Sequence, residues 1–181
     1  YRCKCGTIKK NDSVNEKIIM MFSDLLLYER LTLEHDFLPF DCGDSDLNEY
    51  LFQNSKSYQE QLLAVTYYLQ NELDTVVFFS LLNDKITAME LSNSFWRKIK
   101  NLFPYSKHRK DYPAVKIGRL GVNKKYQQTG NNWGTLTLDY IKRWMVTENK
   151  TGCRFITVDA YQSAVPFYLK NGFLFMGSQE R

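Results

Sequence analysis

A strand, a polar loop and a long helix follow one another between Ala114 and Glu148, and this succession most restricts the fold. The apolar run Ala114–Val122 comes directly after Pro113 and predicts a central β-strand. A Gln/Gly/Asn loop then leads into an amphipathic stretch from Trp133 to about Glu148, which predicts a helix of several turns. A strand followed by such a helix is typical of a mixed α/β domain.

The rest of the chain continues this alternation. Asp44 or Ser45 is placed to cap a helix, and helical spacing recurs around Trp96 and around Tyr168. The predicted strands are Asp24–Leu31, a hairpin formed by Leu62–Leu69 and Thr75–Leu82, Phe155–Val158 and Phe173–Met176. We expect one domain over residues 21–181. Residues 1–20 are an N-terminal extension whose order the pattern leaves open.

Composition excludes several classes of protein. The chain has 181 residues with 44% hydrophobic side chains, which suits one globular domain. It has no apolar run of the roughly 18–20 residues that a membrane span needs, and no secretory signal, so we expect a cytoplasmic protein. The four cysteines are scattered, and Cys3 and Cys5 lack a second ligand pair. With only two histidines besides, no metal site is expected.

The loop Tyr126–Thr135 is a candidate anion site. The first turn of a helix presents unpaired backbone N–H groups and the positive end of the helix dipole, which suit a phosphate or pyrophosphate. Glycines before a helix are also ordinary turn residues. The loop alone therefore leaves both interpretations open.

A second candidate segment runs from Val158 to Phe173. Gly172 stands where a helix C-cap belongs, and Phe173 begins the last predicted strand. Tyr168, within the helix, is either a functional hydroxyl or a half-buried core residue.

Taken together, the two segments resemble the acetyl-CoA-binding core of the GNAT acetyltransferases. Arg119–Val122 is similar to the family's fourth strand, and the loop after it to the family's Gln/Arg-x-x-Gly-x-Gly/Ala signature. Phe167–Phe173 matches the family's FYxKxGF segment. Phe40–Leu51 and Tyr112–Leu120 resemble the subgroup that includes toxins that acetylate aminoacyl-tRNA. The resemblance covers roughly Asp24 to Met176.

The resemblance implies a fold and a reaction. The fold is a mixed α/β one, with a mostly antiparallel central sheet splayed between its fourth and fifth strands and helices on both faces. Acetyl-CoA is the co-substrate. An amine attacks the thioester directly in a ternary complex, a backbone N–H near Val122 stabilises the oxyanion, and Tyr168 protonates the departing thiolate. A tyrosine with its ordinary pKa of about 10 holds this proton at neutral pH.

The resemblance also assigns the cofactor contacts. The peptide groups of Leu120, Gly121 and Val122 would pair with pantetheine. The pyrophosphate would bind the loop residues Gln127, Gln128, Thr129, Gly130, Asn131, Asn132, Trp133, Gly134 and Thr135.

The chain departs from the family pattern at two places. The family's second glycine, two residues after Gly130, is Asn132 here, and the apolar register of the helix fits better if Gly134 takes that role. The sequence also ends at Arg181, where the family usually adds another strand. That strand is expected to be absent, disordered or replaced by a partner chain.

The acceptor is an amine of unknown identity. The strand Ala114–Val122 has no carboxylate to act as a base, and the nearest acids before it in sequence are Asp111 and Glu90. A lysine amine needs deprotonating help, whereas an α-amine with a pKa near 7.7–8 is already partly neutral. The absence of a carboxylate on this strand therefore favours an α-amino acceptor, such as an aminoacyl group. Water would act as the proton relay.

The segment before that strand is basic. Its candidate acceptor-side residues are Arg97, Lys98, Lys107 and Arg109, interleaved with aromatic residues. Such a pattern is typical of tRNA or other nucleic-acid binding, but also of a solvated helix face whose aromatics pack inward.

Two functions follow. The first is an N-acetyltransferase acting on charged tRNA, as a toxin with an antitoxin partner, or on another amine. The second is a degenerate GNAT domain that binds CoA or a partner without turnover. Homodimerisation is a further expectation of the family resemblance.

Overall fold

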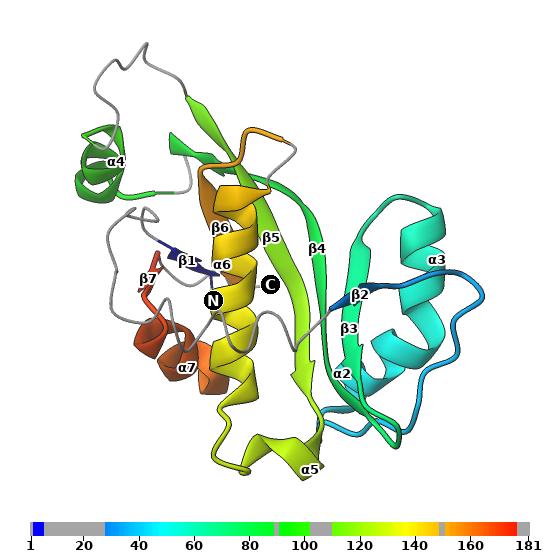
Figure 1. The fold of residues 1–181 in the computed structure, drawn as a ribbon. Coiled ribbons are helices and arrows are strands. Elements are labelled where there is room, and N and C mark those ends of the chain that lie inside the picture. Colours follow the sequence, from blue (N-terminus) through cyan, green and yellow to red (C-terminus); the bar gives the residue numbers. More distant parts are fainter. Residues whose placement is uncertain (1, 6–27, 89–90, 102–109, 149–150, 177–181) are drawn as a thin grey trace. The chain divides into compact units, whose positions relative to one another are not determined.

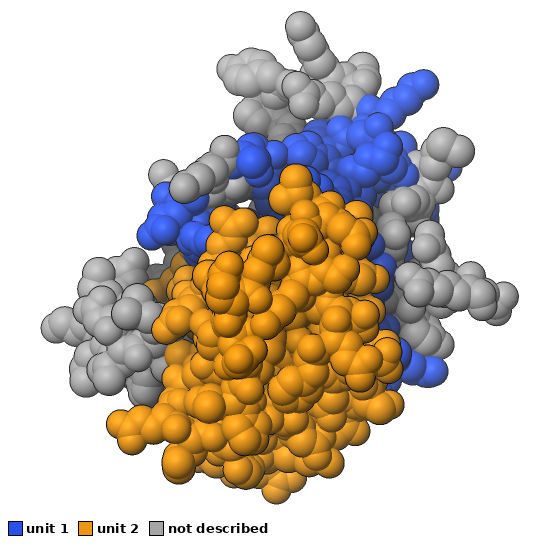
Figure 2. Space-filling model, turned by 90° about the vertical axis from the view of Figure 1, so that its right-hand side faces the viewer, with its two compact units in different colours: residues 1–8, 83–117, 144–181 blue, residues 9–82, 118–143 orange. Residues whose placement is uncertain are grey.

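The computed structural model describes residues 2–5, 28–88, 91–101, 110–148 and 151–176. The chain forms two compact units (Figure 2). Unit 1 comprises residues 1–8, 83–117 and 144–181, and unit 2 comprises residues 9–82 and 118–143. Strands β4 (Thr75–Thr87) and β5 (Asp111–Val122) each have residues in both units.

Unit 2 contains an antiparallel arrangement of β2 (Glu29–Arg30), β3 (Val65–Gln70) and the first part of β4. The predicted hairpin is confirmed, because β3 and β4 pair from Val65 opposite Leu81 to Gln70 opposite Thr75. The side chain of Asn71 forms the turn. Its Oδ1 accepts hydrogen bonds from the N–H groups of Leu73 (2.9 Å) and Asp74 (2.8 Å).

A continuous helical segment follows the Phe40–Asp44 turn. It consists of α2 (Ser45–Glu49), a π-helical turn η1 (Tyr50–Asn54) and α3 (Ser55–Glu60). The predicted cap is confirmed at Asp44, whose carboxylate accepts the N–H of Leu47 at 3.1 Å.

Helices cover both faces of the strands in unit 2. Consecutive residues of a strand point to opposite faces, and Phe78 and Phe79 show which helix each face meets. Phe78 packs with Tyr50 of η1, whereas Phe79 approaches Tyr28 and Tyr140 of helix α6 (Trp133–Thr147). Both phenylalanines are fully buried.

Unit 1 contains the single parallel pair among the described registers. β5 pairs with β6 (Phe155–Asp159) from Ala114 opposite Phe155 to Ile117 opposite Val158. Beyond β6, the strand order is β6-β1-β7, and both neighbours of β1 are antiparallel to it (Figure 1). β1 is Arg2–Cys5 and β7 is Phe173–Phe175.

Strand β1 belongs to the N-terminal extension, whose order the sequence left open. Residues 6–20 of that extension, and residues 24–27 of the predicted first strand, lie outside the described residues. Residues 177–181 also lie outside them, so the expectation about a further C-terminal strand concerns a part of the chain that the structure does not describe.

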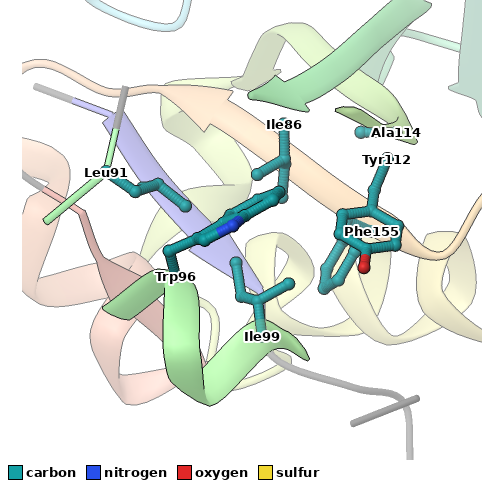
Figure 3. Close-up of a cluster of buried hydrophobic side chains, with 7 residues drawn as sticks. All are labelled: Ile86, Leu91, Trp96, Ile99, Tyr112, Ala114 and Phe155. Carbon is teal, nitrogen blue, oxygen red and sulfur yellow. The ribbon is translucent and has the colours of Figure 1, made fainter. Parts of the chain in front are cut away.

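Among the described residues, two α-helices lie wholly within unit 1. Helix α4 (Asn93–Lys100) buries Trp96 and Ile99 in a cluster with Ile86, Leu91, Tyr112, Ala114 and Phe155 (Figure 3). Helix α7 (Val165–Lys170) follows a short 3₁₀ turn, Gln162–Ala164. Gly172 ends α7 with a φ of +79°, as the predicted C-cap requires.

The architecture is therefore a mixed α/β fold with mostly antiparallel strands, as predicted. None of the helices within the described residues is both long enough and apolar enough to cross a membrane.

Candidate functional site

The end of strand β5 is the first part of the site. The parallel register of β5 with β6 ends at Ile117, and β5 continues to Val122. Gly121, in this last part, lies against two aromatic rings. A Cβ atom here would be 2.7 Å from Cε1 of Phe78 and 3.2 Å from Cζ of Phe40. Only glycine fits this position without movement of a buried ring.

Asn123 fixes the start of the loop that follows β5. Its side chain is buried, and its Nδ2 donates to the carbonyl oxygens of Thr75 (3.0 Å) and Pro39 (3.3 Å). Its Oδ1 accepts the N–H of Lys125 at 3.2 Å and so caps the short helix α5 (Lys124–Gln127), which the sequence analysis missed. The start of the loop is thus held by the first residue of β4 and by Pro39.

Two ion pairs hold helix α5 on the neighbouring turns. Lys125 Nζ lies 2.7 Å from Oδ1 of Asp74, whose other oxygen accepts the hydroxyl of Tyr126 at 3.1 Å. The ammonium group of Lys125 and the Tyr126 hydroxyl both lower the pKa of Asp74. Lys124 Nζ lies 3.0 Å from Oδ2 of Asp41 in the Phe40–Asp44 turn.

The ion pair between Lys124 of helix α5 and Asp41 depends on pH. Hydrogen bonds from Asn48, from the N–H of Gly43 and from Lys124 lower its pKa to about 2. A depressed pKa stabilises the folded chain above the unfolded-state pKa of about 3.9, and this stabilisation disappears as the pH falls through about 2.

We therefore expect Asp41→Asn to be less stable than the unmodified chain at pH 7, with the difference shrinking between about pH 4 and pH 2. Because Asp41 is exposed, salt should reduce the effect. Urea unfolding at several pH values measures it. A stability difference that stays constant from neutral pH to pH 2 would contradict the role of the carboxylate.

The backbone turns sharply at Gly130 and Asn132. Both have positive φ, +78° and +49°, and asparagine tolerates this left-handed conformation better than other non-glycine residues. The carbonyl of Asn132 accepts the N–H of Leu136 at 3.1 Å, so α6 begins directly after it. Asn132 thus takes the conformation that a second glycine would supply, and Gly134 is part of the helix.

The mouth of α6 is the remaining part of the loop site. The N–H groups of Trp133, Gly134 and Thr135 belong to its first turn, where an α-helix offers donors without intrahelical partners. The first turn has no acidic residue. The Trp133 ring packs beside the cluster of Leu69, Val76 and Val77 and thereby anchors the turn, and its Nε1 has no acceptor within the described residues.

Tyr168 lies in helix α7 of unit 1. Its side chain is buried, with ring centroids 5.2 Å from Phe167 and 5.3 Å from Phe173. The loop residues 127–135 belong to unit 2, so the approach of Tyr168 to the loop stays a prediction.

The predicted acceptor-side residues are only partly described. Arg97 is exposed on α4, and Lys98 is on the same helix. Lys107 and Arg109 lie outside the described residues. Trp96 points into the cluster of Figure 3, so this aromatic residue packs inward and is not available for base stacking.

The sequence analysis missed a polar cluster in unit 1. The hydroxyl of the fully buried Thr157 donates to Asp84 of β4, and Lys116 Nζ lies 2.9 Å from Asp159 Oδ2. Asp84 thus brings a carboxylate close to the central strands, although β5 has none between Ala114 and Val122. The polar residues 83–85 within an otherwise apolar strand were the available signal.

The fold is that of the GNAT acyltransferases, as predicted from the sequence. No protein-family model matches the chain. Among solved structures it is similar to a mutant of KacT in which a tyrosine is replaced by phenylalanine, with 23% identity and a TM-score of 0.66 over 85% of this chain and 89% of that one.

It is also similar to AtaT complexed with acetyl-methionyl-tRNAfMet, with 25% identity and a TM-score of 0.65 over 86% of this chain and 90% of AtaT. A third structure is a tyrosine-to-phenylalanine mutant of the AtaT toxin bound to the C-terminus of the antitoxin AtaR and acetyl-CoA. Here the identity is 22% and the TM-score 0.62, over 84% of this chain and 86% of that one.

Proposed function

We propose that this chain is an acetyl-CoA-dependent N-acetyltransferase whose catalytic domain comprises residues 21–181, with strand β1 (Arg2–Cys5) added to its sheet. The observation that carries the proposal is the pair of left-handed residues, Gly130 and Asn132, directly before the open N-terminus of α6. A strand, a turn of this kind and a helix mouth suit a pyrophosphate. The similar structure of AtaT contains acetyl-CoA, which supports coenzyme A as the source of that pyrophosphate.

Strand β5 would hold the pantetheine arm. The peptide groups of Leu120, Gly121 and Val122 follow the part of β5 that is paired with β6, and an extended pantetheine chain offers amide groups for such peptides. The loop from Gln127 to Thr135 would hold the pyrophosphate. The hydrogen bonds from Gln127 Nε2 to the carbonyls of Val122 (2.8 Å) and Cys42 (2.9 Å) support a fixed starting point for this loop.

In the reaction, the neutral amine attacks the thioester carbonyl and forms the C–N bond, which gives a tetrahedral oxyanion, and the C–S bond breaks when this intermediate collapses. A backbone N–H near Val122 would stabilise the oxyanion. Tyr168 would give its proton to the coenzyme A thiolate, and the proton of the attacking amine would leave through water.

The acceptor we favour is the α-amine of an aminoacyl group on tRNA. Such an amine needs little help from a base, in keeping with the absence of a carboxylate on β5 between Ala114 and Val122. The similarity to AtaT solved with acetyl-methionyl-tRNAfMet supports this acceptor, and its complex with AtaR supports an antitoxin partner.

The alternative, a degenerate domain that binds coenzyme A without turnover, was suggested by Asn132 in place of glycine. The positive φ of Asn132, a conformation usual for glycine, supports a loop that still binds the pyrophosphate, and an assay of turnover separates the two functions. Incubation with labelled acetyl-CoA, bulk charged tRNA and a panel of amines tests the function. Label in the charged tRNA fraction is expected, and label in no fraction would contradict acetyl transfer.

Gly130→Ala should weaken acetyl-CoA binding by about five-fold or more. A Cβ at Gly130 meets no atom within 4 Å, so the cost comes from the φ of +78° and from the methyl group placed at the proposed pyrophosphate contact. Calorimetric titration with acetyl-CoA measures the affinity.

Two glycines provide matched controls for this variant. Gly172→Ala introduces the same left-handed strain, at φ +79°, in another turn with no atom within 4 Å of the added Cβ. Gly152→Ala adds a methyl group in open space without a positive φ. Both should bind acetyl-CoA nearly normally. Equal loss of affinity in Gly130→Ala and Gly172→Ala would show that strain alone, and not the loop site, is responsible.

A further inference from the structure

The N-terminal strand β1 is inserted between two strands from the opposite end of the chain. Arg2, Cys3 and Lys4 lie opposite Asp159, Val158 and Thr157 of β6, and Cys3, Lys4 and Cys5 lie opposite Phe175, Leu174 and Phe173 of β7. Figure 1 shows β1 beside these strands, with α7 connecting β6 to β7.

The insertion separates β6 from β7. Both are antiparallel to β1, so they run parallel to each other and are second neighbours. Adjacent strands lie about 4.8 Å apart, which puts β6 and β7 about 10 Å from each other. Without β1, this space matches the width of one strand, and the facing edges of β6 and β7 lose their partners together.

The edges of β6 and β7 that face β1 consist of buried residues. With β1 in place, Thr157, Val158 and Phe173 are each at most 3% exposed. Removal of β1 would break the main-chain pairing of both edges at once and expose these residues to water. An extended segment in this position therefore stabilises unit 1.

We propose that the space between β6 and β7 is a strand-acceptor site, and that it accepts the Arg2–Cys5 segment from a second copy of this chain as well as from its own. Recognition is through the main chain, in the manner of strand addition to a sheet edge, except that both edges of the added strand are used. A segment of four residues fills the site.

The length of the connection permits donation between copies. Residues 6–28 lie between β1 and the start of β2 at Glu29. A chain of this length spans up to about 75 Å when extended, which exceeds the diameter of a small domain. A link of this length does not by itself restrict the segment to its own acceptor site.

Lys4→Pro tests the role of β1, because proline removes the N–H of a residue that is paired on both sides. The variant should melt roughly 5–10 °C below the unmodified chain. Lys4→Ala keeps the N–H and is the matched control, which should melt within about 1–2 °C of it. Equal melting temperatures for Lys4→Pro and Lys4→Ala would exclude a stabilising strand.

A synthetic peptide of residues 1–8 then tests the acceptor site. Added to the Lys4→Pro chain, it should raise the melting temperature in a concentration-dependent manner, whereas the same peptide with Lys4→Pro should not. No shift with the unmodified peptide would overturn donation in trans. The readout is unfolding and not acetyl transfer, so the result is independent of the proposed function.

Discussion

Replacing Tyr168 with phenylalanine should lower the turnover number by about ten-fold or more, while acetyl-CoA binding is retained. The coenzyme A thiolate must acquire a proton when it leaves, and the proposed mechanism assigns this proton to the phenolic hydroxyl. Phenylalanine keeps the ring that packs between Phe167 and Phe173, so α7 should stay in place. Thiol release in the presence of the acceptor measures turnover, and calorimetric titration measures binding.

The matched control for this variant is Tyr161→Phe. Tyr161 precedes the same helical segment but is 57% exposed, and it has no role in the proposed chemistry. Its turnover should be close to that of the unmodified chain. Near-normal turnover of Tyr168→Phe would refute the assignment of the proton donor, and loss of acetyl-CoA binding would indicate a structural role for the hydroxyl instead.

Gly121→Ala should reduce both stability and acetyl-CoA affinity. The added methyl group would lie 2.7 Å from Cε1 of Phe78, a fully buried ring, and 3.2 Å from Cζ of Phe40. Overpacking of this kind costs about 1–3 kcal/mol. Relief of the overlap requires a shift of β5, and the same strand offers the peptide groups proposed for pantetheine. We therefore expect about ten-fold weaker binding.

Urea unfolding and calorimetric titration measure the two effects, and Gly152→Ala is the control with open space around the added Cβ. Phe78→Leu, combined with Gly121→Ala, should restore part of the lost affinity, because the two positions are in contact. Unchanged stability and affinity in Gly121→Ala would show that β5 tolerates a side chain here, and would remove the argument from close packing.

Much of the fold followed from local patterns in the sequence. The hairpin, the Asp44 cap, β5, α6 and the end of α7 at Gly172 all depend on the periodicity or turn chemistry of a few consecutive residues. These signals are strong because the hydrophobic face and the capping residue lie close together in the chain.

The features that were missed depend on distant residues. Arg2–Cys5 is too short and too polar to indicate a strand, and it becomes one through β6 and β7. Asp84 meets Thr157 only after the strands assemble. The loop site stays a prediction, and the left-handed φ of Asn132 within it is a property of the folded turn that the sequence did not indicate. The approach of Tyr168 to that loop depends on how the two units are placed. The turnover of Tyr168→Phe tests it.

The buried amide of Asn123 has a consequence for how the loop changes over evolution. Its bonds to Thr75 and Pro39 are made by folding alone, before any ligand arrives. Ligand binding therefore does not have to supply the free energy that orders the start of the loop. The affinity for acetyl-CoA then depends less on which exposed side chains follow Asn123. Natural variants are accordingly expected to keep Asn123 more strictly than the side chains of Gln128, Thr129 and Asn131, provided that the main chain of the loop still offers its N–H groups to the pyrophosphate.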